Sequence, residues 1–333
     1  MGDPTPLIIL SFCDIQTTLL ISLTSMDWRK KVEVFWNKTK FLIVYDHVHF
    51  LPHKKEALQW VTRYCRNLRV IDVRWNVFPI PLLVDLIRTS PLLEIYLTSY
   101  GEKAIFETIY EMCPYIKGLS ILTSDLPLET LLKFKSLTAI ELGNYTSFLN
   151  ITTQEVSRIL AHNSGLQIVH ILGFTNSFVL LESLRPDRLK SFSAPYEQNR
   201  ITVDHVQLLQ PFARLENINF GQSSYDDVFQ VLQTITRNHP NIQSLSFYPN
   251  DVSSEIRVLS HIANGRFFPC LEKLGCRIKP ATRDAYTKLS RTRNQIVVYD
   301  YEQERATPHN WCYTPFDLWF LMKKYGSNSH KQW

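Results

Sequence analysis

The chain has 333 residues, of which 45% are hydrophobic, 12% aromatic and 20% charged. Such a chain can bury a large core, which excludes global disorder, and its 10 Gly and 17 Pro exclude a collagen-like sequence. The 36 Lys and Arg residues against 31 Asp and Glu give a net charge of +5, which is too small and too dispersed to require a nucleic acid partner. No apolar run reaches the roughly 18 residues of a membrane-spanning helix, so we expect a soluble protein with no membrane partner.

The residues before position 39 predict a compact helical segment. Leu19, Leu20 and Leu23 recur at helical spacing, and Trp28 and Val32 continue the same apolar face. We expect residues 1–38 to form a functional element separate from the rest of the chain.

The amino end does not have the pattern of a secretory signal. Asp3 stands where basic residues are expected, and Asp14 and Gln16 interrupt the apolar run. The 6 cysteines occur without a CxxC pair, which favours a reducing compartment over a disulfide framework or a zinc site. We therefore expect a cytoplasmic or nuclear protein, with a secreted recognition protein as the alternative.

From position 68 onwards, a short apolar pattern of the form L-x-x-L-x-L recurs through most of the chain. Its copies begin on average about 25 residues apart, which is within the range of leucine-rich repeats. Each copy predicts a short buried strand. The triplets are Leu68-Ile71-Val73, Leu92-Ile95-Leu97, Ile116-Leu119-Ile121, Leu137-Ile140-Leu142, Leu166-Val169-Ile171, Leu189-Phe192-Ala194, Leu215-Ile218-Phe220, Ile242-Leu245-Phe247 and Leu271-Leu274-Cys276.

Segments with helical periodicity lie between these triplets. Breakers such as Pro91, Pro114, Gly165 and Pro240 follow them and precede the next triplet. The repeating unit is therefore strand, turn, helix, turn. The predicted helices cover residues 55–64, 82–87, 104–112, 155–160, 203–209, 228–235 and 256–262.

One such unit cannot bury both faces of its strand, so neighbouring units must stack. We expect an α/β leucine-rich-repeat solenoid over residues 39–301, with a parallel β-sheet on the concave face and helices outside. Strands within 41–48 and 296–301 are expected to cover the two ends of the sheet.

Side chains that alternate with the buried ones should point to the concave face of the sheet. Tyr and Arg at its two ends are residue types enriched at interaction hot spots, so this face is the candidate site for a target protein. The alternative is that these are ordinary polar strand positions facing water. The candidate substrate-binding residues are Asp72, Arg74, Tyr96, Thr98, Glu141, His170, Asn219, Tyr248 and Arg277.

The carboxyl-terminal residues 302–333 are rich in aromatic side chains. Thr314 and Pro315 predict the start of a helix that carries Phe316, Trp319 and Phe320. We interpret this segment as a cap on the last repeat, the alternative being that it shapes the concave face or docks on a partner.

The sequence has no catalytic motif: it lacks a G-x-S-x-G elbow, a phosphate-binding P-loop, a dinucleotide fingerprint and an HExxH helix. We expect neither catalysis nor a cofactor. His47, His49 and His53 lie close together without a further ligand at suitable spacing, so no metal site is expected. Arg291 and Arg293 are interpreted as part of a solvated basic surface.

The amino-terminal residues 6–15 and 19–29 resemble the later two-thirds of an F-box. They show an apolar helix end, a turn containing Asp14, a Leu-rich helix and a Trp at position 28. The opening Leu-Pro and most of the first F-box helix have no counterpart before Pro6. Together with the repeats, this shortened F-box makes the chain similar to F-box/leucine-rich-repeat proteins.

This resemblance implies the substrate-recognition adaptor of an SCF-type, cullin-based ubiquitin ligase. The F-box-like element would bind a Skp-type adaptor, and the repeats would bind an unidentified protein substrate. The alternative interpretations are a helical cap on the solenoid for this element, and a repeat scaffold without any link to ubiquitin for the chain. The residues that would contact the adaptor are Leu10, Phe12, Leu19, Leu20, Leu23 and Trp28.

Overall fold

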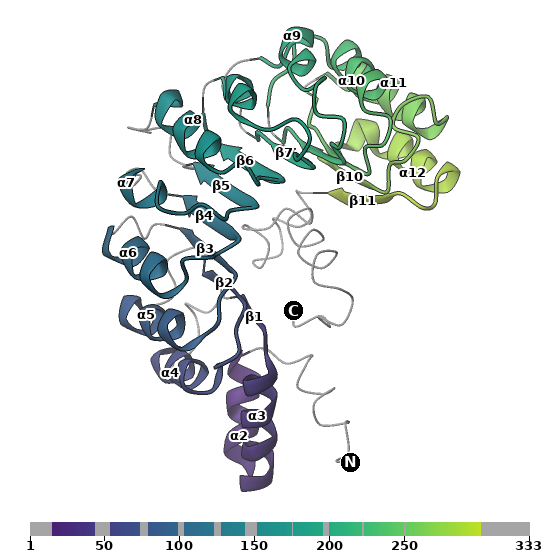
Figure 1. Cartoon of the computed structure of the whole chain (residues 1–333). Helices are drawn as coiled ribbons and strands as arrows, with labels where there is room; N and C mark the ends of the chain where they lie inside the picture. Colours follow the sequence, from purple (N-terminus) through teal and green to yellow (C-terminus); the bar gives the residue numbers. More distant parts are fainter. Residues whose placement is uncertain are drawn as a thin grey trace.

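The chain folds as a curved solenoid of strand and helix units (Figure 1). The computed structural model describes residues 15–43, 54–73, 79–98, 103–122, 128–143, 152–174, 176–195, 200–221, 223–249 and 251–300. In this part of the chain an 11-stranded sheet lines the inner side of the curve, and the helices cover its outer side. This is the leucine-rich-repeat architecture that the recurring triplets predict.

All neighbouring strands are parallel, and their order in the sheet is their order in the chain. The expected end strands are present as the first and last strands of the sheet. The strands are β1 (Phe41–Ile43), β2 (Val70–Val73), β3 (Glu94–Thr98), β4 (Gly118–Leu122), β5 (Ala139–Gly143), β6 (Ile168–Leu172), β7 (Ser191–Ser193), β8 (Asn217–Asn219), β9 (Ser244–Ser246), β10 (Lys273–Cys276) and β11 (Val297–Asp300).

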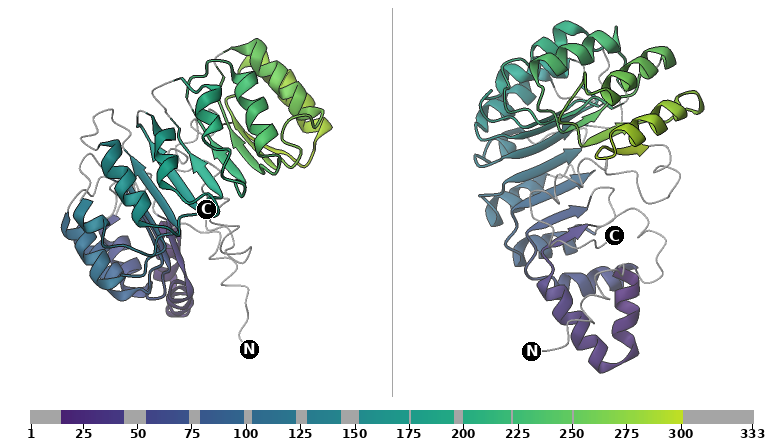
Figure 2. Two further views of the ribbon diagram at one scale, coloured as in Figure 1. Left: turned by 45° about the horizontal axis from the view of Figure 1, so that its top comes forward. Right: turned by 90° about the vertical axis from the view of Figure 1, so that its right-hand side faces the viewer.

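The helices form one layer on the outer side of the sheet, and a helical pair stands at its amino end (Figure 2). They are α2 (Ile15–Thr24), α3 (Met26–Lys38), α4 (Lys54–Tyr64), α5 (Ile80–Thr89), α6 (Lys103–Met112), α7 (Leu128–Leu131), α8 (Thr153–His162), α9 (Val203–Gln207), α10 (Val228–Asn238), α11 (Val252–Ala263) and α12 (Arg283–Thr292), with 3-10 turns η2 (Ser177–Ser183) and η3 (Pro280–Thr282).

The core lies between the sheet and the outer helices. The triplet residues fill it: Ile71, Leu119 and Leu245, for example, are completely buried. Large aromatic side chains such as Phe106 and Phe192 complete the packing. Side chains alternate between the two faces of a strand. The last two apolar residues of each triplet are two positions apart, so both face the helices.

Three outer elements are absent from the sequence prediction: α7, η2 and α12. Helix α12 has only Tyr286 and Leu289 as fully buried side chains, so its apolar face is too narrow to stand out among charged residues. Cys276 packs in the core as a small apolar residue, whereas Cys270 is exposed. The predicted segment 302–333 lies outside the described residues.

The residue that follows an outer helix is repeatedly buried against the preceding repeat. The Ser90 hydroxyl donates to the Cys65 carbonyl at 3.4 Å. The Asn163 amide oxygen accepts the backbone N–H of Leu137 at 3.4 Å. After α5 and α8, the residue that follows the helix thus bonds one repeat to the one before it.

Arg293 occupies this position after α12 and is buried, not part of a solvated surface as the sequence indicated. Its guanidinium donates to four backbone carbonyls of the preceding repeat: Ile262 at 3.2 Å, Phe268 at 3.0 Å, Pro269 at 2.7 Å and Leu271 at 3.5 Å. Burial lowers the pKa of the Arg293 guanidinium below its usual value. The acceptors include Phe268, whose φ of 47° is in the left-handed region, so Arg293 holds a strained loop in place.

Candidate functional site

Helices α2 and α3 form an antiparallel pair at the amino end of the solenoid, joined by Ser25 alone. The Ser25 hydroxyl accepts the backbone N–H of Trp28 at 3.2 Å and so caps α3. The Thr24 hydroxyl donates to the Ile21 carbonyl at 2.7 Å and closes the end of α2. The sequence therefore fixes a tight turn between the two helices.

The helical pair is packed firmly on the first repeat. Val32, Phe35 and Trp36 of α3 are buried. The Trp36 ring meets Trp60 of α4 edge to face, with ring centroids 6.0 Å apart. The Asn67 side chain donates to the Asn37 carbonyl at 2.6 Å. In α2, Thr18 and Ser22 are buried and Ile21 packs against the core, so both helices contribute to this packing.

Helix α2 and the start of α3 expose a row of large apolar side chains. The exposed fractions are 55% for Leu20, 73% for Leu23 and 67% for Met26. Leu20 and Leu23 are three residues apart on α2, which places them on adjoining parts of one helix face. Met26 begins α3 directly after the turn at Ser25. Contiguous exposed apolar side chains typically mark an interaction site.

The predicted adaptor-binding residues do not all lie on this row. Leu20 and Leu23 belong to it, whereas Trp28 is half-buried against the core, with the Lys31 ammonium 5.2 Å from its ring centroid. Leu19 lies in α2, but its side chain is not described. Leu10 and Phe12 lie outside the described residues. Met26 was not predicted as a contact, although its spacing from Leu23 is readable in the sequence.

The strand register brings five predicted substrate-binding residues into one row across the sheet. Asp72 pairs with Tyr96, and Glu141 pairs with His170. The row continues through Ser120, Ser193 and Ser246 and includes Asn219. Thr98 is the last residue of β3, and Tyr248 and Arg277 follow the ends of β9 and β10.

Two of these candidates are engaged within the sheet. Glu141 and Asn219 are buried, and the Glu141 carboxylate accepts a hydrogen bond from the Ser120 hydroxyl. The Asn219 amide oxygen accepts the backbone N–H of Gly221 at 2.9 Å. Strands lie only about 4.8 Å apart, so neighbouring side chains in a row are in contact. Neither residue offers the open contact surface that the sequence indicated.

Other candidates lie closer to solvent. His170 and Tyr248 are half-buried, and Arg277 is exposed. Asp72, Tyr96 and Thr98 have described backbones in β2 and β3, but their side chains are not described. Arg74 lies outside the described residues. Of the candidates whose side chains are described, the exposed Arg277 and the half-buried Tyr248 lie next to β10 and β9.

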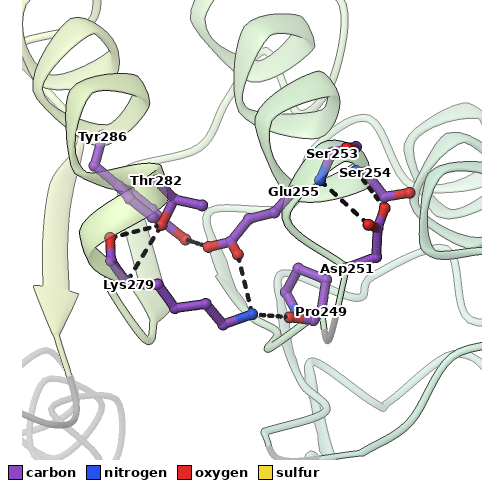
Figure 3. A network of polar contacts seen from close by, with 8 residues as sticks. All are labelled: Pro249, Asp251, Ser253, Ser254, Glu255, Lys279, Thr282 and Tyr286. Carbon is purple, nitrogen blue, oxygen red and sulfur yellow. Dashed lines mark hydrogen bonds and ion pairs between the residues drawn. The ribbon is translucent and has the colours of Figure 1, made fainter.

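A polar network next to this end of the sheet was not predicted from the sequence (Figure 3). Glu255 of α11 is buried and accepts the Tyr286 hydroxyl of α12 at 2.7 Å. The Lys279 ammonium lies 3.5 Å from the Glu255 carboxylate and donates to the Pro249 carbonyl at 2.7 Å. Burial, with the nearby Cys276 and Glu255, raises the pKa of Tyr286 well above its usual value.

This network ties the last two outer helices to the loops that follow β9 and β10. Beside it, Asp251 caps α11 by accepting the backbone N–H groups of Ser254 at 2.6 Å and Ser253 at 3.3 Å. Hydrogen bonds from Ser254, and then from Ser253, hold the pKa of the Asp251 carboxyl below its usual value. The Glu255 Oε2 atom has no hydrogen bond in the described part of the chain and faces the Lys279 ammonium as an ion pair. The network joins the two helices to these loops.

No group of three or more His, Cys, Asp or Glu side chains in the described part of the chain is arranged to hold a metal ion. His47, His49 and His53 lie outside that part. Among the described helices, none combines the length and apolar character needed to cross a bilayer.

Comparison with known proteins finds chains of similar fold but no matching family. No protein-family model matches the chain, and no curated protein matches it. A chain in the crystal structure of the Rad7 and Elc1 complex in yeast is 14% identical, with a TM-score of 0.52, and the match covers 84% of this chain and 79% of that one. The leucine-rich-repeat protein LegL7 from Legionella pneumophila is 11% identical, with a TM-score of 0.49, over 79% of this chain and 90% of that one. The parallel sheet, with its strands in chain order and helices on one side, gives the chain the α/β fold of a leucine-rich-repeat solenoid.

Proposed function

We propose that this chain is the noncatalytic substrate-recognition adaptor of an SCF-type, cullin-based ubiquitin ligase. The α2 and α3 pair contacts a Skp-type adaptor, and the repeat array holds a target protein. The observation that carries the proposal is the exposed apolar row Leu20, Leu23 and Met26 on a helical pair that is otherwise packed against the first repeat.

The arrangement suits an adaptor because its two contact surfaces are separate. The apolar row stands at the amino end of the solenoid, whereas Arg277 and Tyr248 lie near its carboxyl-terminal end (Figure 1). Helical pairs with an exposed apolar face bind partner helices through side chains spaced three and four apart. A target protein can then occupy the sheet without displacing the adaptor.

Two further points support the proposal. Residues 6–15 and 19–29 resemble an F-box, and the described part of that segment is helical on both sides of Ser25. The similar chain from the Rad7 and Elc1 complex comes from an assembly of two different proteins. The proposal places the protein in the cytoplasm or nucleus.

The test is retention of a purified Skp-type adaptor by the immobilised full chain. We expect the wild-type chain to retain the adaptor and the double variant Leu20→Asp, Leu23→Asp to lose it, because charges at these positions cannot be buried in an apolar interface. The control is Ile256→Asp, which places one such charge at a 41% exposed position on α11.

Circular dichroism melts of the three proteins establish that the repeats stay folded. If the wild-type chain does not retain the adaptor, or if the double variant retains it as well as Ile256→Asp does, the ligase proposal is wrong. The chain would then be a repeat scaffold for protein binding without a link to ubiquitin.

A further inference from the structure

The loops that lead from each outer helix to the next strand carry an uneven distribution of charge. These loops lie side by side along the amino ends of the strands. The loops before β1 to β6, residues 39–40, 65–69, 90–93, 113–117, 132–138 and 163–167, contain no acidic residue. They contain six exposed basic residues, which we name the basic edge: Lys40, Arg66, Arg69, Lys117, Lys133 and Lys135.

The register of the loops sets the spacing along the basic edge. The Lys40 carbonyl accepts the backbone N–H of Arg69 at 2.7 Å, so these two residues occupy successive rungs. The Arg69 carbonyl in turn accepts the N–H of Leu93, whose carbonyl accepts the N–H of Lys117 at 2.6 Å. From β1 to β5 the basic edge spans four strand spacings, or about 19 Å.

Four of these cations have no role in holding the fold together. Arg66 donates to the Arg63 carbonyl at 2.9 Å, and the Lys133 ammonium lies 5.6 Å from the Tyr110 ring centroid. In contrast, no hydrogen bond, ion pair or ring contact of the side chains of Lys40, Arg69, Lys117 or Lys135 exists in the described part of the chain.

Helix stabilisation does not account for Arg69 and Lys117 either. Basic residues favour the last turn of a helix because its carbonyl end is negative, and this effect fades beyond that turn. Arg69 and Lys117 lie five residues past the ends of α4 and α6. A set of like charges without counter-charges costs stability through self-repulsion, which an anionic partner would remove.

Large apolar side chains stand among the cations. Tyr115, two residues before Lys117, is 77% exposed, and Met112 at the end of α6 is 46% exposed. Exposed Tyr and Met next to Arg are a composition typical of protein interaction sites. The loop before β7 still carries basic residues, but Asp187 pairs there with Arg185 and Arg188, and Glu216 and Glu272 lie in the loops before β8 and β10. The run of loops without an acidic residue therefore ends at β6.

We infer that the basic edge binds an extended acidic segment of a partner protein, with an apolar or aromatic side chain of that segment against Tyr115. An extended polypeptide advances about 3.4 Å per residue, so about six residues span the edge. A single-stranded nucleic acid fits less well, because such sites use aromatic side chains for successive bases, and only Tyr115 is an exposed aromatic residue in these loops. This inference goes beyond adaptor binding and concerns a different surface.

The experiment measures fluorescence anisotropy of a labelled Glu-Glu-Tyr repeat peptide of about 12 residues with the full chain. We expect saturable binding that weakens at high salt, since exposed charges are screened. The triple variant Lys40→Glu, Arg69→Glu, Lys117→Glu is expected to weaken binding by about tenfold or more. The matched control reverses three exposed charges of α12, Arg283, Lys288 and Arg291, and is expected to bind as the wild type does.

The two triple variants have the same net charge, so a difference in their peptide binding reports the position of the reversed charges. Equal weakening in both would show an effect of overall charge alone and would overturn the inference. Absence of peptide binding by the wild type, or tighter binding of a DNA duplex or of phosphatidylserine vesicles than of the peptide, would overturn it as well. None of these outcomes depends on whether the Skp-type adaptor is retained.

Discussion

Replacing Arg293 by Met removes the buried guanidinium that joins the last two repeats while keeping a side chain of similar length. The guanidinium donates to four carbonyls of the preceding repeat, and the Pro269 bond is the shortest at 2.7 Å. The Ile262 and Phe268 carbonyls also accept the backbone N–H groups of Gly265 and Leu271. Loss of Arg293 therefore weakens two shared acceptors and leaves Pro269 without a bond from this side chain.

The expected cost follows from these bonds. Each of the four bonds from the guanidinium contributes about 0.5–1 kcal/mol, because its acceptor is shared or, like the part-buried Pro269 carbonyl, can be reached by water. Arg293→Met should therefore lower the free energy of unfolding of the last repeats by about 3 kcal/mol, and Arg293→Lys, which keeps the charge but presents a smaller set of donors, by about half of that.

Hydrogen exchange followed by mass spectrometry is the suitable assay, because repeat proteins unfold in parts and one global transition averages over them. Peptides that cover α11, β10 and α12 should be most protected from exchange in the wild type, less protected in Arg293→Lys and least protected in Arg293→Met. Peptides from β2 to β5 should be unchanged. If the Met variant protects α11 and α12 to within about 0.5 kcal/mol of the wild type, the assignment of Arg293 as an anchor is refuted.

Three further predictions concern individual contacts. Tyr286→Phe removes the donor to the buried Glu255 carboxylate and should cost about 1–2 kcal/mol in urea unfolding; an unchanged midpoint would contradict the network. Gly143→Ala places a Cβ 2.3 Å from the Leu172 backbone oxygen at a φ of 154° and should lower the free energy of unfolding by more than about 2 kcal/mol. Gly165→Ala meets nothing closer than 3.5 Å and should lower it by less than about 1 kcal/mol. Equal melting temperatures of the two variants would contradict the clash. Hydrogen bonds keep the pKa of Asp251 below its unfolded value, so its stabilisation is present above about pH 4 and is lost as the pH falls through the folded value. The stability difference between wild type and Asp251→Ala should thus shrink on acidification, and a difference that grows would refute the sign.

The solenoid was predictable because its signal is local and repeated. Leu68, Ile71 and Val73 show the spacing of a strand buried against helices, and the pattern returns at a nearly constant interval. Helix α8 was also readable, since Thr152 and Glu155 form a capping box before an apolar face. By contrast, α12 was missed because only Tyr286 and Leu289 form its buried face, and two apolar residues among charged ones give a weak helical pattern.

The details of the surfaces were less predictable because they depend on register and burial. The sequence placed Glu141 and Asn219 correctly on the sheet face, but burial of their side chains depends on neighbours from other strands. Arg293 looked like a solvated charge, since nothing near it in the sequence shows that four carbonyls converge on it. The basic edge likewise emerges only when loops about 25 residues apart are placed side by side.

The agreement between strand order and chain order has a consequence for synthesis. Each new strand pairs with the one made just before it, so no segment has to wait for a distant part of the chain. The solenoid can therefore grow on the ribosome from its amino end, with a finished rung always ready as the template for the next. Each newly made strand is covered as soon as the next one pairs with it, which shortens the time in which its edge is open to aggregation.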